Sequence, residues 1–176
     1  MSLQPKFWNA DKIVSFSAIL ISLATMAIYL YQTHLIQKQQ HAMVMPYLRM
    51  GYSYDEDRFE MLVSNEGLGP AFIDEVNTYY KGKKYSHKDI SGFLFDVYYK
   101  IDTTLFANVS NISESMLMSA NKKIYLISKT NSIEQSQKFQ KLFFSKDLVL
   151  EVKYSSIYGD KWVLSGTDVR PTKIED

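Results

Sequence analysis

The feature that most constrains this chain is an uncharged apolar run at residues 13–31, IVSFSAILISLATMAIYLY. At about 1.5 Å per residue, a helix of this length is roughly 28 Å long, close to the hydrocarbon thickness of a bilayer. Phe7 and Trp8 precede the run and Tyr29 and Tyr31 end it, where aromatic side chains settle at membrane interfaces. The sequence therefore predicts one transmembrane helix over 13–31, after an N-terminal flank of residues 1–12.

Two other interpretations of this run are a cleaved signal peptide and a buried helix of a soluble core. The apolar run is long for a signal peptide, and its best small-residue cleavage site, Thr25-Met26-Ala27, is poor because a small residue is wanted three before the cut. Its length and lack of charge argue against a core helix. Basic residues flank both ends, so the positive-inside rule leaves the side of the membrane open.

Small or hydroxylated side chains recur along one stripe of the predicted span, at Ser15, Ala18, Ser22 and Thr25. Such a stripe permits close approach of a second helix and self-association, although Ser and Ala are also common in single-pass helices. Residues 32–45 hold good helix formers with neither glycine nor proline, so we expect a helical stalk that stops before Pro46.

From Pro46 onward the pattern changes from helical to alternating, which predicts a β domain over 46–170 and a polar, frayed tail over 171–176. A short helix capped by Ser86 is expected, with Leu94, Phe95 and Tyr98 towards the core. Residues 132–144 start with a serine cap and are expected to form a helix or an ordered loop. Strands are expected in the following stretches: YLRMGYSY, RFEMLVS, AFIDEVNTYY, KKIYLIS, DLVLEVKYSSIYG and KWVLSGTDV. Five to seven antiparallel strands with one or two helical excursions predict a mainly β sandwich.

The stretch SNEGLGPAFI concentrates two glycines and a proline between two strand patterns. We expect Asn65, Gly67 and Gly69 to take positive φ at a corner, with Pro70 fixing the chain before the next strand. A glycine-rich phosphate loop is the competing interpretation. It lacks both the Lys-Ser/Thr ending and a following helix.

Four segments together carry a family resemblance: YQT after the apolar run, PYL at 46–48, NEGLGPA at 65–71 and the late VKYSSIYGDKW. With these motifs the chain resembles a widespread group of bacterial single-pass membrane proteins to which no activity is assigned. The resemblance implies an immunoglobulin-like sandwich after a single anchor. It also favours a cytoplasmic domain, because the stretch after the anchor is often basic in that group, whereas His34, Lys38 and His41 are less basic here.

Composition excludes several classes of function. A net charge of +1 leaves no basic excess for a nucleic-acid backbone, and the absence of cysteine excludes thiolate and disulfide chemistry. His34 and His41 lie seven apart on the predicted stalk, but no Cys or carboxylate completes a metal site. Asp55, Glu56 and Asp57 lack calcium-loop spacing and are expected to form a solvated turn. No catalytic motif is recognisable, so we expect no enzyme, metal or cofactor.

One basic cluster remains as a candidate site. Four lysines bracket a histidine in KGKKYSHK, and as a basic rim they would contact an anionic ligand or a lipid headgroup: Lys81, Lys83, Lys84, His87 and Lys88. A solvated hairpin tip is the alternative.

The sequence thus predicts a single-pass protein of a bacterial inner membrane whose β domain serves protein interaction or assembly. Its expected partners are the lipid bilayer and either another protein or a second copy, through anchor and stalk. The alternative is a membrane-bound sensor or defence effector that binds a small anionic ligand at the basic rim. A hydrolase on a β scaffold, with no assigned nucleophile, is the third hypothesis.

Overall fold

The computed structural model describes residues 9–102, 105, 107–128, 130, 132–166, 168 and 170–174. They fall into two compact units, Met1–Ala42 and Met43–Asp176. Most of the expected flank, with Phe7 and Trp8, lies outside the described residues.

The helix α1 spans Ala10–Met43 and buries none of its residues. Span and stalk are therefore one continuous helix, as predicted, which ends three residues before Pro46. It is the one helix among the described residues that is long and apolar enough to cross a membrane. The hydroxyls of Thr25 and Thr33 donate to the carbonyl oxygens four residues earlier, at 2.8 and 2.9 Å, so neither polar group is left unsatisfied in an apolar surrounding.

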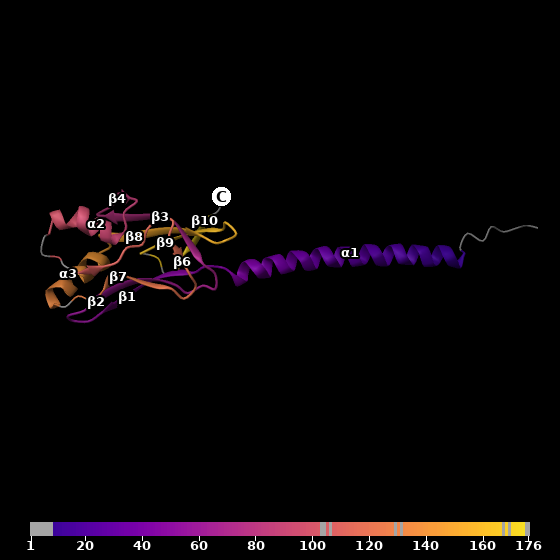
Figure 1. Ribbon diagram of the computed structural model, residues 1–176, viewed down its shortest axis with the longest axis horizontal. Coiled ribbons are helices and arrows are strands. Elements are labelled where there is room, and N and C mark those ends of the chain that lie inside the picture. The colour runs from indigo at the N-terminus through magenta and orange to yellow at the C-terminus, as the bar shows by residue number, and fades with distance from the viewer. Residues whose placement is uncertain are drawn as a thin grey trace, which may run out of the picture. The chain divides into compact units, whose positions relative to one another are not determined.

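The second unit is built on two antiparallel sheets (Figure 1). One sheet has the order β1 (Leu48–Tyr54), β2 (Phe59–Asn65), β7 (Lys123–Ser128), β5 (Asn108–Val109). The other has the order β10 (Thr172–Ile174), β9 (Lys161–Ser165), β8 (Leu148–Ser155), β3 (Ala71–Tyr80), β4 (Lys83–Ser86), and β6 (Leu117–Met118) also pairs with β3. The six strands expected from the sequence are confirmed, and four short ones are added.

One hydrophobic core lies between these elements. Along β8 burial alternates strictly, so Leu150, Val152 and Tyr154 point inward while the residues between them are half-buried. Phe59 of β2 stacks on Phe139 of the helix α3 (Ile133–Phe144), with ring centroids 5.6 Å apart. Among the described residues, the hydrophobic core cluster runs from Leu48 to Leu164, and α1 supplies none of its members. The β domain thus closes its core without α1.

The helical segments differ from expectation in one detail. The Ser132 side chain caps α3 by accepting from the N–H of Gln135, as predicted. The helix α2 (Ile90–Asp96), followed by a short 3₁₀ turn η1 (Tyr98–Lys100), is capped by Asp89 and not by Ser86. Ser86 instead ends β4, because that strand pairs with β3 as far as Ser86, opposite Asn77.

Two further corrections concern the end of the chain and one side chain. The tail expected to be frayed contains β10, which pairs with β9 from Thr172 to Ile174. Phe95, expected to face the core, is 66% exposed. The core side of α2 is already filled by Ile90 and Phe93, which leaves Phe95 on the outer side of this short helix.

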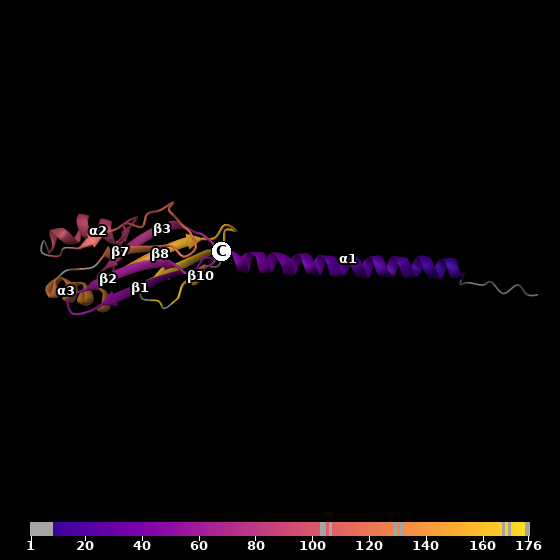
Figure 2. The ribbon, with the colours of Figure 1, turned by 60° about the horizontal axis from the view of Figure 1, so that its bottom comes forward.

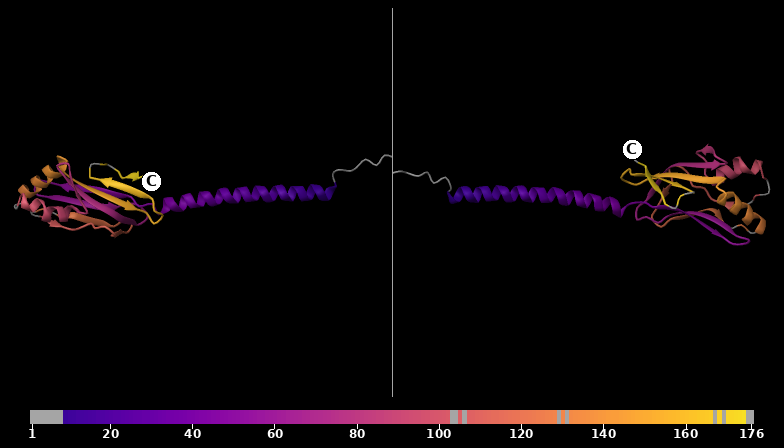
Figure 3. Two further views of the ribbon diagram at one scale, coloured as in Figure 1. Left: turned by 90° about the horizontal axis from the view of Figure 1, so that it is seen from above. Right: turned by 180° about the vertical axis from the view of Figure 1, so that it is seen from behind.

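The β domain has two distinct ends. The end where β1 begins carries the segments 44–47, 66–70, 119–122 and 156–160, because the strand registers bring these segments to the same edge of the sheets. We call it the junction end. The helices α2 and α3 lie at the opposite, distal end in every view (Figures 1, 2 and 3).

Candidate functional site

The corner SNEGLGPAFI is organised by one buried asparagine. Asn65 is fully buried, and its amide nitrogen donates to the carbonyl oxygens of Gly69 (2.8 Å) and Met118 (3.0 Å). Its amide oxygen accepts from the N–H groups of Tyr47 (3.2 Å) and Gly67 (3.0 Å). One side chain therefore joins the start of β1, the corner and β6, and all its hydrogen-bonding capacity is used.

The two glycines of this corner have a different role from the one expected. Neither Gly67 nor Gly69 takes a positive φ, so that prediction is wrong. A β-carbon at Gly67 would lie 2.4 Å from the carbonyl oxygen of Met45, and one at Gly69 would lie 1.7 Å from that of Val44. Glycine is needed because the corner runs directly against the backbone of 44–47, the segment that follows α1.

Motifs quoted separately from the sequence meet at this place. The N–H of Glu66 donates to the carbonyl oxygen of Tyr47 (2.7 Å), which joins NEGLGPA to PYL. The N–H of Leu48 donates to the hydroxyl of Tyr154, from the late tyrosine-rich strand, at 3.3 Å. Burial raises the pKa of Tyr154 to about 12, so this hydroxyl stays protonated over the ordinary pH range. The structure supports a corner here, and the motifs form a structural joint.

The basic rim does not converge on one anion site. Lys84 pairs with Glu75 at 3.3 Å, His87 Nδ1 lies 2.6 Å from Glu114 Oε1, and Lys88 pairs with Asp96. Lys81 and Lys83 flank the tip of the β3–β4 hairpin, each over a tyrosine ring. Positive φ at Lys81 (48°) and Gly82 (77°) forms a two-residue hairpin turn, as KGKK predicted.

The outer face of β3 and β8 carries a polar network that the sequence did not indicate. Glu75 accepts from Lys153 (2.6 Å), Asn77 (2.8 Å) and Lys84 (3.3 Å), and the amide of buried Asn77 also donates to Glu151 (3.0 Å). Hydrogen bonding, first from Lys153 and then from Asn77, lowers the pKa of Glu75 to about 2. A carboxyl held ionised by two lysines is a poor general acid, so this network fits a structural role.

A third feature is an apolar pocket of about 240 Å³ at the distal end. Residues of α2, η1, α3 and the segment around β5 line it: Leu94, Phe95, Tyr98, Tyr99, Leu105, Ala107, Val109 and Phe139. Phe95, Tyr99 and Ile101 are exposed nearby. The sequence does indicate an unusual surface here, because residues 90–101 include more apolar side chains than one face of a short helix can bury.

The residues considered as metal ligands from the sequence are the histidine pair His34 and His41 and the acidic run 55–57. No group of three His, Cys, Asp or Glu side chains among the described residues is placed to hold a metal ion. Asp55, Glu56 and Asp57 form the exposed β1–β2 turn, and the carbonyl oxygen of Asp55 accepts from Ser136 (3.0 Å) and Gln140 (3.2 Å) of α3.

Comparison with known proteins adds no relative: no family model, no curated protein and no solved structure matches this chain.

Proposed function

We propose that this protein is a single-pass membrane protein in which α1 anchors an immunoglobulin-like β-sandwich that binds a partner protein and catalyses no reaction. Two observations support the anchor. The helix is long and apolar enough to span a bilayer, and it buries none of its side chains. The β domain has its own core, so it needs no packing against α1 to fold.

The distal pocket carries the interaction proposal. Its lining is apolar and aromatic, and one of the lining residues, Phe95, is 66% exposed. Exposure of such apolar surface to water is unfavourable, and a partner that covers it would remove this cost. At about 240 Å³ it is smaller than most pockets for drug-sized ligands, which run from about 300 to 1,000 Å³. One aromatic or branched aliphatic side chain of a partner protein fits this volume. Such anchors in central pockets dominate many interfaces.

Photo-crosslinking in native membranes tests this proposal. A benzophenone amino acid replaces Phe95 in the full-length chain, and the matched control carries it at Tyr54, which is also an exposed distal aromatic. A second variant adds Ala107→Leu, which fills the pocket from its lining without changing the labelled position.

We expect one discrete adduct from position 95, none from position 54, and loss of the adduct when Ala107→Leu is added. Adducts that form equally at both positions, or that survive the filled pocket, would contradict a partner seated in this pocket.

The bacterial inner-membrane location and self-association along Ser15, Ala18, Ser22 and Thr25 remain parts of this proposal. In the sensor alternative, an anionic ligand would contact Lys81 and Lys83. These are the two members of the basic rim that form no ion pair with a described residue. The sensor alternative predicts that Lys81→Glu with Lys83→Glu abolishes stabilisation by an added anion, whereas the partner-binding proposal predicts an unchanged Phe95 adduct in the same variant.

A further inference from the structure

A set of large apolar side chains lies exposed at the junction end. Its members, the junction patch, are Met45, Leu68, Phe72, Leu117, Ile157 and Tyr158, between 40% and 74% exposed. Phe72 and Leu117 are direct cross-strand partners between β3 and β6. Single exposed apolar residues are ordinary, but several gathered at one end of a domain mark a contact surface.

The backbone holds Leu68 outward. The N–H of Leu68 donates to the carbonyl oxygen of Met45 (3.2 Å), and the carbonyl oxygen of the next residue, Gly69, accepts from Asn65 (2.8 Å). The corner is therefore hydrogen-bonded on both sides of Leu68, and the Leu68 side chain is 74% exposed.

The second apolar loop is held in the same way. In the β8–β9 connection the N–H of Ser156 donates to the backbone carbonyl oxygen of Asp160 (2.9 Å), and the N–H of Gly159 donates to that of Ser156 (3.0 Å). The Ser156 hydroxyl accepts from the N–H of Tyr158 (3.2 Å), and Gly159 takes a φ of 83°. The loop therefore presents Ile157 and Tyr158 at its tip, an apolar residue beside an aromatic one with a polar end, which suits a membrane interface.

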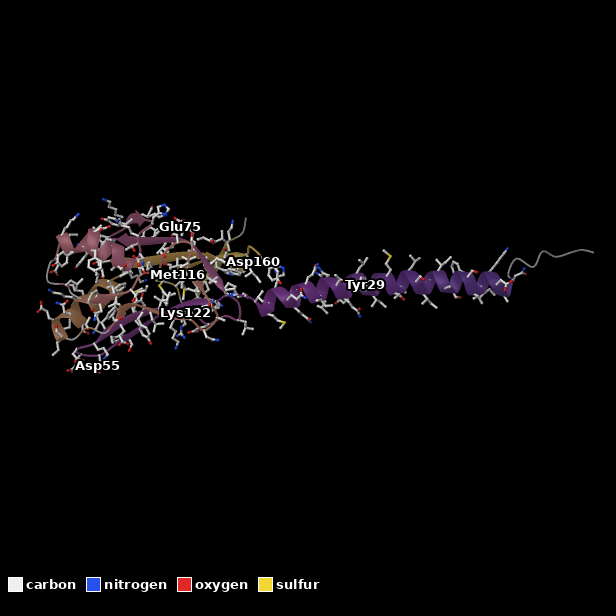
Figure 4. All side chains as sticks on the ribbon, in the orientation of Figure 1. Tyr29, Asp55, Glu75, Met116, Lys122 and Asp160 are labelled. Atoms are coloured by element: carbon white, nitrogen blue, oxygen red, sulfur yellow. The ribbon has the colours of Figure 1, made fainter. Side chains whose placement is uncertain are left out.

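Basic side chains also lie at the junction end. Lys122 and Lys123 are exposed at the start of β7, and no ion pair within the described part of the chain involves either. Figure 4 shows Lys122 and Asp160 towards the junction end and Asp55 at the distal end. Lysines near a membrane surface are attracted to anionic lipid headgroups.

The covalent tether limits where the junction end can lie. Beyond residue 31 the helix continues to Met43, a rise of about 18 Å at 1.5 Å per residue. The headgroup layer occupies several ångströms of that distance, since a bilayer of about 40–45 Å has a hydrocarbon core of about 30 Å. The patch is thus held within reach of the membrane surface.

We propose that the junction patch docks on the surface of the bilayer that α1 crosses, with Leu68, Ile157 and Tyr158 in the interface and Lys122 and Lys123 on anionic headgroups. This inference rests on the proposed anchor. It adds a second, reversible contact between the β domain and the membrane.

Spin-label accessibility in nanodiscs tests the proposal on the full-length chain, which has no cysteine to remove. Single cysteines replace Leu68 or Ile157 in the patch, Tyr54 at the distal end as the matched exposed control, and Ile21 inside the span. Each label is probed with oxygen, which concentrates in lipid, and with a water-soluble nickel chelate. Nanodiscs of neutral lipid alone are compared with nanodiscs that include anionic lipid.

We expect the oxygen-to-nickel accessibility ratio at positions 68 and 157 to exceed that at 54 by about threefold or more in anionic nanodiscs, as for side chains in a lipid interface. Lys122→Glu with Lys123→Glu should reduce this difference. Water-like values at 68 and 157 with a lipid-like value at 21 would overturn the docking and leave the anchor standing. Protection from both reagents at 68 and 157 would indicate a protein contact and also overturn it. A water-like value at 21 would overturn both proposals.

Discussion

Val44 and Gly69 are in direct backbone contact, so close that a β-carbon at Gly69 would lie 1.7 Å from the Val44 carbonyl oxygen. The segment that leaves α1 is thereby pressed against the corner before β3. Since Asn65 bonds both the same corner and Tyr47, the segment 44–47 and the corner are held together within the β domain.

Gly69→Ala tests this contact. The added methyl collides with backbone and not with a flexible side chain, so the corner or the segment 44–47 must move. We expect a loss of at least about 3 kcal/mol in the free energy of unfolding, at the upper end for single substitutions. Urea unfolding of the full-length chain in detergent, followed by Trp162 fluorescence in a Trp8→Phe background, measures it.

Gly51→Ala is the matched control. A β-carbon at Gly51 would meet only the Leu62 side chain, at an ordinary 3.5 Å. We expect a change of less than about 0.5 kcal/mol there. Equal effects at the two glycines would refute the account of the corner.

Asn65→Ala should also destabilise the domain. It leaves the carbonyl oxygens of Gly69 and Met118 and the N–H groups of Tyr47 and Gly67 without the partner they share in a buried site. A cost of about 2–4 kcal/mol is expected from such losses. Asn108→Ala, at an exposed position on β5, serves as the control in the same unfolding experiment and should be near neutral.

Glu75 gives a pH-dependent prediction. Its folded pKa of about 2 lies below the ordinary value of 4.5, so its ion pairs stabilise the folded state above about pH 4.5 and that stabilisation is lost as the pH falls towards 2. Glu75→Gln should cost about 1–2 kcal/mol near neutral pH, allowing for solvent screening of a partly exposed pair. The difference from the unmodified protein should shrink as the pH is lowered through this window.

Denaturant titrations at several pH values measure that difference. Glu56→Gln, in the exposed β1–β2 turn, is the control and should change the stability by less than about 0.5 kcal/mol. A Glu75→Gln cost that stays constant down to about pH 2 would mean that packing of this side chain matters and its charge does not.

Asp89→Ala should remove the cap of α2 and its link to the segment around Ile112. The Asp89 carboxylate accepts from the N–H of Gly92 (2.8 Å), the Ser91 hydroxyl (2.9 Å) and the N–H of Ile112 (3.0 Å). We expect a loss of about 1–2 kcal/mol in stability from the lost cap, together with a weaker Phe95 crosslink. Ser86→Ala, at the position that the sequence pattern favoured as cap, should cost little. The reverse order of the two effects would contradict the observed cap.

Local patterns explain which parts of this fold were predictable. The β1–β2 hairpin, the alternation along β8 and the Ser132 cap of α3 depend on neighbouring residues, and the sequence predicts all three correctly. Asp89 was missed because Ser86 also precedes the helical segment, and only the pairing of β4 decides between them.

Long-range contacts account for the failures. The reason for glycine at position 69 could not be inferred from the local sequence. It is the close approach of the Val44 backbone, which belongs to another segment. The pairing of His87 with Glu114, 27 positions further along the chain, could not be inferred from the stretch KGKKYSHK. The distal pocket is lined by residues of α2, η1, α3 and the segment around β5. These residues come from separate parts of the chain, so no single stretch of sequence indicates the pocket.

The central claim is that α1 remains uncleaved and anchors the β domain in a bilayer. Alkaline carbonate extraction of membranes that contain the full-length chain, followed by intact mass measurement of both fractions, tests it most directly. The account predicts a membrane pellet that retains the chain at about 20.4 kDa. Recovery in the supernatant, or a mass shortened by the residues up to a cleavage point near Ala27, would contradict it.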